Sequence, residues 1–211
     1  MTVTDTVTSG ITGSQTGLSI TASSASTLTV TGVSGGAAPA ISSVTVRAKD
    51  VYGNTATGYT GRIAFTSTDA QAALPANYSF VAADAGVHTF SNNVTLKTAG
   101  SQSVTAKDTV TGSITGLQSG VVVSAGATSK FVWSALGSTQ VGQTNTLTLS
   151  ATDAYGNLTS GYAGTTTFTS SDGGDPAELH LRGGRRRRAR LRYPLRHPGH
   201  PVRGGDRHAE R

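Results

Sequence analysis

Two aspartates begin the same short motif at two places in the chain, and this motif could help to hold a cation. Asp50 opens Asp-Val-Tyr-Gly-Asn, and Asp153 opens Asp-Ala-Tyr-Gly-Asn. A calcium ion takes six or more oxygen ligands, to which such a turn could contribute. The alternative is a turn capped by the Asp side chain, with Gly or Asn in a left-handed conformation. Because no further acidic residues cluster nearby in the sequence, we favour the capped turn; Asp50 and Asp153 are the calcium candidates, and we expect no other metal site.

His88 is the one histidine of residues 1–172, and it raises the question of catalysis. Strand-like alternation places it on one face with Phe90, beside the turn Asp84-Ala85-Gly86. A catalytic histidine needs a nucleophile and an orienting acid within hydrogen-bond reach. The sequence contains no phosphate-binding loop and no His-Glu-x-x-His motif. We therefore interpret His88 as structural and predict no catalytic residue, no cofactor and no enzymatic activity.

A run of arginines in Leu181–Arg192 could bind nucleic acid by neutralising phosphates. The formal net charge of the 211-residue chain is +6, but residues 1–172 hold six basic and seven acidic residues. The basicity therefore belongs to residues 173–211. Because Tyr193 is the one aromatic residue close to the run, we predict no specific nucleic-acid partner.

A shift of reading frame explains this run. If Arg is encoded as CGN and Leu as CTN, a one-base shift lets Arg182–Ala189 encode Val-Ala-Ala-Asp-Ala-Gly-Val-His, which is the sequence of Val81–His88. In the shifted frame, the residues that flank Arg182–Ala189 also permit, in order, the amino acids found at the equivalent positions of the preceding repeat. We predict that residues 173–211 are a frameshifted, disordered or arbitrarily placed tail, in which Arg185–Arg188 are Asp-Ala-Gly-Val read one base out.

The composition of residues 1–172 favours strands over helices. Thr, Ser, Gly, Val and Ala dominate, whereas the strong helix formers Leu, Met, Lys and Glu are scarce. The absence of cysteine excludes disulfides, thiolate metal sites and Cys nucleophiles. No apolar stretch is long enough to cross a bilayer, and no signal peptide is visible in this fragment, so we expect no membrane insertion by this part.

An internal repeat of 103 residues organises the chain. Ala48–Asp69 returns as Ala151–Asp172, and Asp5–Gly17 returns as Asp108–Gly120 at the same offset. We predict the C-terminal end of one repeat in residues 1–21, a complete repeat in 22–124 and the N-terminal half of a third in 125–172.

The complete repeat reads as short strands separated by turns. Val44, Val46 and Ala48 alternate with polar residues, which is the period of a half-buried strand. About 100 residues with about seven short strands match an immunoglobulin-like antiparallel β-sandwich without disulfides. We predict Tyr59, Phe65, Phe80 and Phe90 as the bulky core residues. In the third repeat we predict strands at Lys130–Ala135, Asn145–Ala151 and Thr165–Thr169, with Trp133 as a core residue or a sugar-stacking residue.

The motifs Lys-Asp-Val-Tyr-Gly-Asn and Thr-Asp-Ala-Tyr-Gly-Asn, each followed by Gly-Tyr-x-Gly and Phe-Thr-Ser, resemble bacterial Ig-like repeats of the invasin and intimin group. The resemblance covers about residues 1–172. It implies an extracellular or cell-surface location and a stalk that carries binding domains away from the cell. The tip domain and outer-membrane barrel of complete members of that group are missing here, so the resemblance names no ligand.

Three functions follow as hypotheses. The first is a non-enzymatic spacer repeat in an adhesin-like surface or secreted protein, whose partners are the neighbouring repeats of the same chain. The second is a module that binds carbohydrate or a host or matrix protein through loops at one end of the sandwich. The third is an accessory domain of a secreted enzyme, which requires a catalytic domain that this sequence does not contain.

Overall fold

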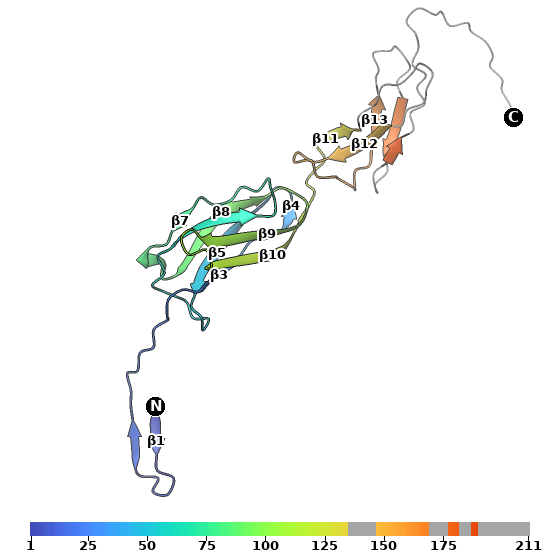
Figure 1. Ribbon diagram of the computed structural model, residues 1–211. Coiled ribbons are helices and arrows are strands. Elements are labelled where there is room, and N and C mark those ends of the chain that lie inside the picture. Colours follow the sequence, from blue (N-terminus) through green and yellow to red (C-terminus); the bar gives the residue numbers. More distant parts are fainter. Residues whose placement is uncertain (135–146, 169–176, 182–186, 190–211) are drawn as a thin grey trace, which may run out of the picture. The chain divides into compact units, whose positions relative to one another are not determined.

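The computed structural model describes residues 1–134, 147–168, 177–181 and 187–189, and this part is built from strands (Figure 1). Its one helical element is a 3-10 turn, η1 (Ala82–Asp84). No helix in the described ranges has the length and apolarity that crossing a membrane requires. The strands are β1 (Thr2–Thr4), β2 (Thr12–Ser14), β3 (Thr27–Thr31), β4 (Gly36–Ala37), β5 (Ala40–Lys49), β6 (Arg62–Ser67), β7 (Tyr78–Ser79), β8 (Val87–Leu96), β9 (Gly100–Asp108), β10 (Thr115–Ser124), β11 (Lys130–Trp133), β12 (Leu147–Thr152), β13 (Gly164–Phe168), β14 (Ala177–Leu181) and β15 (Arg187–Ala189).

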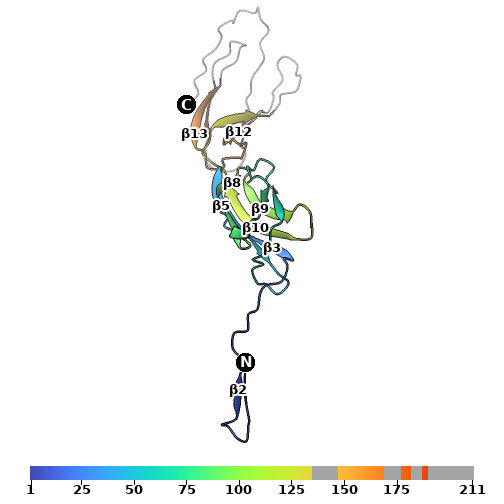
Figure 2. The ribbon, with the colours of Figure 1, turned by 90° about the vertical axis from the view of Figure 1, so that its left-hand side faces the viewer.

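Two sheets form the body between β3 and β10. One has the strand order β3-β5-β8, and the other has the order β4-β10-β9-β6-β7. Neighbouring strands are antiparallel except β4, which pairs in parallel with the end of β10. Figure 2 shows β5 and β8 beside each other, and β9 beside β10. The all-β class and the antiparallel sandwich predicted from the sequence are confirmed.

Alternation along the strands decides which side chains enter the core. Val44, Val46 and Ala48 of β5 are fully buried, whereas Arg47 between them is exposed. β9 repeats the pattern, because Val104 and Ala106 are both fully buried. A strand exposes successive side chains on opposite faces, so small β-branched residues at every second position build a thin, continuous apolar layer.

Aromatic side chains join the two sheets. The rings of Phe65 on β6 and Phe90 on β8 meet edge to face, with centroids 5.0 Å apart. Tyr59 and Phe80 make a similar contact at 5.1 Å. Tyr59, Phe80 and Phe90 are buried as predicted, whereas Phe65 is half-buried.

The hairpin of β1 and β2 reproduces a hairpin of the complete repeat. The Asp5 carboxylate accepts hydrogen bonds from the N–H groups of Val7 and Thr8, and Asp108 accepts them from Val110 and Thr111. The backbone bonds of the two turns also correspond, including Ile11 N–H to Thr8 at 2.9 Å and Ile114 N–H to Thr111 at 2.9 Å. Equal sequence at the 103-residue offset therefore gives equal local structure.

The third repeat supplies three of its strands within the described ranges. The predicted strands correspond to β11, β12 and β13, each of which differs from its predicted range at one or both ends. Residues 135, 145–146 and 169 of the predicted ranges lie outside the described residues. β11 pairs with β12, and β13 pairs with β14.

Two short segments of the predicted tail form strands. Ala177–Leu181 forms β14 against β13, and Arg187–Ala189 forms β15 against β12. Strand pairing uses backbone groups that every non-proline residue carries, so an altered side-chain sequence can still add a short strand to an open sheet edge. The rest of 173–211, including Arg185 and Arg186, lies outside the described residues, and the frameshift stays a prediction.

The chain divides into two compact units. Unit 1 comprises residues 1–35, 40–96 and 101–122; unit 2 comprises 36–39, 97–100 and 123 onward. Residues 36–39 and 97–100, which belong to the predicted complete repeat, are therefore part of the same compact unit as the third repeat. The repeat boundaries at 22, 124 and 172 stay a prediction.

Exchange of one buried leucine for alanine tests the core. Leu96 on β8 is fully buried, whereas Leu117 on β10 is 58% exposed. Leu96→Ala removes buried methyl groups and leaves a cavity, so we expect the free energy of unfolding of unit 1 to fall by about 2–5 kcal/mol. Leu117→Ala makes the same chemical change and should cost less than about 1 kcal/mol. Denaturant titration of both variants measures this difference; equal losses would contradict the assigned inward face.

Candidate functional site

The Asp50 turn is closed by one carboxylate. Its Oδ1 accepts hydrogen bonds from the N–H groups of Tyr52 (3.0 Å) and Asn54 (2.8 Å). Its Oδ2 accepts from the N–H of Ser23 and from the Asn54 side-chain amide, each at 3.1 Å. Gly53 has φ 85°, the left-handed conformation that glycine adopts without steric cost. Asp50 is 2% exposed, so the carboxylate is held inside the turn.

The Asp153 turn has the same construction. Its carboxylate accepts from the N–H groups of Tyr155, Asn157 and Gly126, each at 2.9 Å, and from the Asn157 side-chain amide at 2.7 Å. Asp153 is 1% exposed. The two aspartates that the sequence singles out therefore occupy equivalent positions, one in each unit.

These hydrogen bonds bear on the calcium interpretation. Four donors point at the two oxygens of each carboxylate, which is the arrangement that a capped turn requires. Within the described ranges, no group of three or more His, Cys, Asp or Glu side chains lies close enough to share a metal ion. A calcium role for Asp50 and Asp153 stays a prediction.

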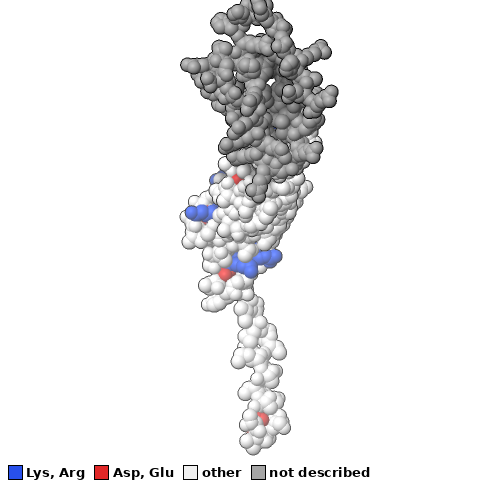
Figure 3. All heavy atoms as spheres, turned by 90° about the vertical axis from the view of Figure 1, so that its right-hand side faces the viewer, with Lys and Arg blue, Asp and Glu red and all other residues white. Residues whose placement is uncertain are grey.

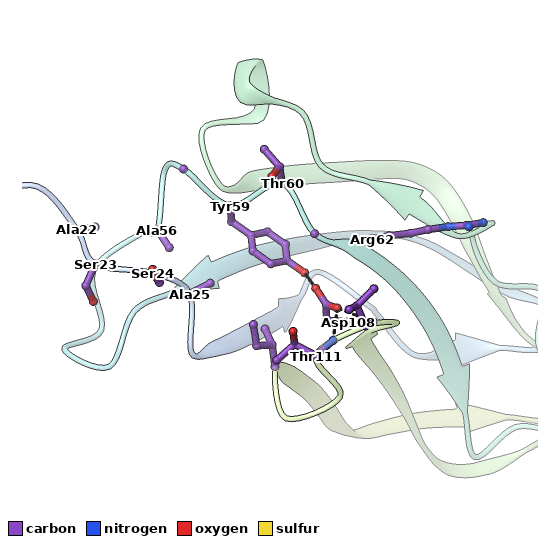
Figure 4. A pocket seen from close by; sticks show the side chains of 14 residues that line it. Ala22, Ser23, Ser24, Ala25, Ala56, Tyr59, Thr60, Arg62, Asp108 and Thr111 are labelled. Carbon is purple, nitrogen blue, oxygen red and sulfur yellow. Dashed lines mark hydrogen bonds between the residues drawn. The ribbon is translucent and has the colours of Figure 1, made fainter.

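A cavity of about 520 Å³ in unit 1 lies beside the Tyr59–Asp108 pair (Figure 4). The Tyr59 hydroxyl donates a hydrogen bond to Oδ2 of Asp108 at 2.5 Å, and both side chains are buried. Arg62 also lines the cavity, but its side chain points away from this pair (Figure 4). Hydroxyl groups of Ser23, Ser24, Thr60 and Thr111 complete the polar part of the wall.

Electrostatics fix the protonation of this pair. Burial raises the pKa of the Tyr59 hydroxyl, and the neighbouring Asp108 carboxylate raises it further. Burial also raises the pKa of Asp108, but hydrogen bonds from Tyr59, Thr111 and Val110 outweigh it and leave the pKa below its ordinary value. A neutral phenol thus donates to a charged carboxylate, which is a short and strong structural bond.

A second cavity of about 550 Å³ occupies the equivalent place in unit 2. Gly126, Thr128, Thr159 and Tyr162 are among its lining residues, 103 positions after residues that line or adjoin the first cavity. Both cavities lie between the segment that opens a repeat and the Gly-Tyr-x-Gly segment. Their recurrence at the repeat period indicates a property of the fold.

His88 belongs to an aromatic cluster. Its Nδ1 lies 2.8 Å from Oδ1 of Asp84, and the ring stacks on Tyr78 at 3.9 Å between centroids. Tyr78 donates its hydroxyl hydrogen bond to Oδ2 of the same Asp84 at 3.0 Å. Phe90 packs against both rings. The Asp84 carboxylate therefore holds a histidine and a phenol together, and the structural role of His88 stays a prediction.

One serine segment has a spacing found in hydrolases. Gly32–Gly36 reads Gly-x-Ser-x-Gly, with exposed Ser34 at its centre. A nucleophile elbow places that serine between a strand and a helix. Here the segment connects the two strands β3 and β4, so the fold does not supply that geometry.

Trp133 is half exposed on β11. The residue is 48% exposed, and its ring meets that of Phe168 edge to face with centroids 5.1 Å apart. Both interpretations made from the sequence, a core residue and a sugar-stacking residue, stay predictions.

Charged side chains are scattered over the described surface. The face in Figure 3 shows a few lysine, arginine and acidic side chains on a surface that is otherwise uncharged. This face offers no contiguous basic stripe of the kind that tracks a phosphate backbone.

Sequence reasoning missed two pairings. Asn157 ends the Asp-Ala-Tyr-Gly-Asn motif, and nothing in that motif indicates that its side chain bonds to the backbone of Lys97 and Ala99. The sequence places Tyr59 in the core but indicates no hydrogen-bond partner for it, and it indicates no structural role for Asp108. The 103-residue period repeats the Tyr and the Asp, and this recurrence is the signal that could have indicated their pairing.

Comparison with known proteins gives one structural match. No protein-family model matches the chain, and no curated protein sequence matches it. A solved structure of FdeC, an Escherichia coli adhesin, is similar at 23% sequence identity and a TM-score of 0.35. The match covers 74% of this chain and 50% of the FdeC chain, so the chain spans about half the length of that structure.

The turn carboxylates predict how stability depends on pH. Burial raises the pKa of Asp50, Asp108 and Asp153, but the hydrogen bonds to each carboxylate outweigh it, and each net pKa lies below the ordinary value. Such groups stabilise the fold above the unfolded pKa of about 3.9 and lose that contribution as the pH falls through the lowered folded value. We expect the Tm to hold from pH 7 to 5 and to drop below about pH 4.

Two matched variants refine this test by calorimetry. Asp108→Asn should lower the Tm of unit 1 at pH 7 and flatten its fall in acid. Asp5→Asn changes the same turn sequence without a tyrosine partner and should have a smaller effect on the β3–β10 body. A Tm that stays constant from pH 5 to acid would show that these carboxylates do not stabilise the fold.

The calcium interpretation has a direct test. The carboxylate of Asp50 accepts four hydrogen bonds, and so does the carboxylate of Asp153. We therefore expect the Tm to be equal with EDTA and with millimolar calcium. Magnesium at the same ionic strength is the control. A rise in Tm with calcium that Asp153→Asn abolishes would instead assign a cation site.

Proposed function

We propose that the chain is a run of non-enzymatic structural repeats that act as a spacer in an adhesin-like protein of the bacterial surface. One observation carries the proposal: the motif that recurs at the repeat period forms the same closed turn twice, and in each copy the Asp carboxylate accepts four hydrogen bonds from groups of its own unit. Asp50 and Asp153 are almost completely buried. A motif kept for binding or catalysis would present such groups to a ligand.

The wider architecture supports a repeated building block. The Asp-Thr-Val-Thr hairpin turn also recurs with the same hydrogen bonds at Asp5 and Asp108. Repeat proteins gain stability from units that each form the same local structure and contact their neighbours. The resemblance to invasin- and intimin-type repeats extends the proposal to the cell surface and to neighbouring repeats as partners.

A binding module is the second candidate. The cavity beside Tyr59 and Asp108 has hydroxyl groups and one arginine on its wall, which are side chains that can bind sugars. However, the carboxylate is engaged by Tyr59 and two backbone N–H groups. The one acid of the cavity wall is therefore already engaged, and we rank this function below the spacer. An accessory role beside a secreted enzyme has no specific observation in its favour.

Copy number separates the two candidates. Chains in which residues 22–124 are present once, twice and three times should gain equal increments of maximum dimension in small-angle X-ray scattering, since a spacer adds length per repeat. A glycan array and a panel of matrix proteins, probed with the same chains, should show no ligand. Binding that Thr60→Ala or Arg62→Ala abolishes, with the fold retained, would replace the spacer with the binding module.

A further inference from the structure

The Asn157 side chain in unit 2 is completely engaged. Its amide nitrogen donates to the carbonyl of Lys97 at 2.7 Å and to Asp153 Oδ2 at 2.7 Å. Its Oδ1 accepts the N–H of Ala99 at 2.8 Å. The residue is 8% exposed. Each donor and one acceptor of the amide thus has a partner, two of them in the turn of residues 97–100.

This contact selects asparagine by its chemistry. The turn of residues 97–100 presents a carbonyl at Lys97 and an N–H at Ala99, so a partner must both donate and accept at one end. A carboxamide does both, whereas a carboxylate cannot donate and an aliphatic side chain can do neither. Lys97 Nζ also lies 5.9 Å above the ring of Tyr155, which adds a weak cation–π contact beside the amide.

Asn54, the equivalent residue in unit 1, lies in a turn of the same construction, but no contact with a turn like that of residues 97–100 is described for it. Asn54 occupies the Asn157 position, and its turn has the same carboxylate cap and the same backbone bond, from Asp50 N–H to Asn54, at 2.9 Å. Asn54 is exposed, and beyond Asp50 no hydrogen bond of its side chain is described in the part of the chain that the structure covers. Val51 and Tyr52 beside it are 72% and 81% exposed.

We propose that the Asp-x-x-Gly-Asn turn is the joint between successive repeats, and that the exposed Val51–Asn54 surface binds the turn equivalent to Lys97–Gly100 of another copy of the repeat. The segment that we expect on this surface follows from unit 2, where Asn157 of the same motif binds the turn of residues 97–100. The hypothesis deepens the proposed spacer function and rests on it for the source of the second copy.

One difference between the copies limits the proposal to this turn. Ser23 stands where the third repeat has Gly126, and a Cβ at Gly126 would lie 2.1 Å from the carbonyl oxygen of Ala38. A loop equivalent to residues 36–39 therefore has to lie farther from Ser23 than Ala38 lies from Gly126. The Asn54 amide and the incoming 97–100 turn do not involve that position.

Amide hydrogen exchange in the full chain tests the joint that is already formed. Asn157→Ala should speed exchange of the Ala99 N–H about tenfold, because that N–H loses its acceptor. Asn54→Ala is the matched control: it removes the same bond inside its own turn, to Asp50, but should leave Ala99 unchanged. If Asn157→Ala affects Ala99 no more than Asn54→Ala does, the joint is overturned.

A chain with a second copy of residues 22–124 placed before residue 22 tests the open surface. The Ala99 N–H of the added copy should exchange slowly, and Asn54→Ala should restore fast exchange there while the original Ala99 stays protected. Fast exchange in the added copy without any substitution, or slow exchange that survives Asn54→Ala, would overturn the docking surface. The scattering increments of the same chain report on the spacer function independently, so the two proposals can fail separately.

Discussion

Carboxylates that cap turns are the interaction on which this fold depends. The strands are built from small residues, and a thin core of Val, Ala and a few aromatics leaves the turns to fix how strands connect. A charged carboxylate that accepts backbone N–H groups makes hydrogen bonds roughly twice as strong as neutral ones. Each acidic residue within the described residues 1–168 accepts at least one backbone N–H in this way: Asp5, Asp50, Asp69, Asp84, Asp108 and Asp153.

This use of acidic residues also limits the chemistry that the chain can perform. An acid that caps a turn has its pKa lowered, so it stays ionised near neutral pH and has no proton to give as a general acid. Asp84 shows the limit most clearly, because it holds both His88 and Tyr78 in one cluster that otherwise resembles catalytic machinery. The same carboxylates that close the turns therefore have most of their hydrogen-bonding capacity in use inside the fold.

The sequence predicted those features that depend on local spacing. Alternation located the inward residues of β5 and β9, and the repeated Asp-x-x-Gly-Asn motif located two equivalent turns. Local spacing did not indicate that Tyr59 meets Asp108, since 49 residues and several strands separate them, and the recurrence of both residues at the repeat period is the one sign of the pair in the sequence. Nor could local spacing distinguish exposed Asn54 from buried Asn157, because their local sequences are alike and the difference comes from the residues that pack against them.

The two copies of the turn differ where the structure makes no demand on side-chain chemistry. Val51 is replaced by Ala154, and both are exposed, whereas the Asp, Tyr, Gly and Asn positions are identical. The contact of Asn157 with the 97–100 turn is made by an uncharged amide and backbone groups, so dissolved salt does not screen it. A joint of this kind is specified by hydrogen-bond pattern and turn shape rather than by charge. It can therefore recur along a chain whose other surface positions vary.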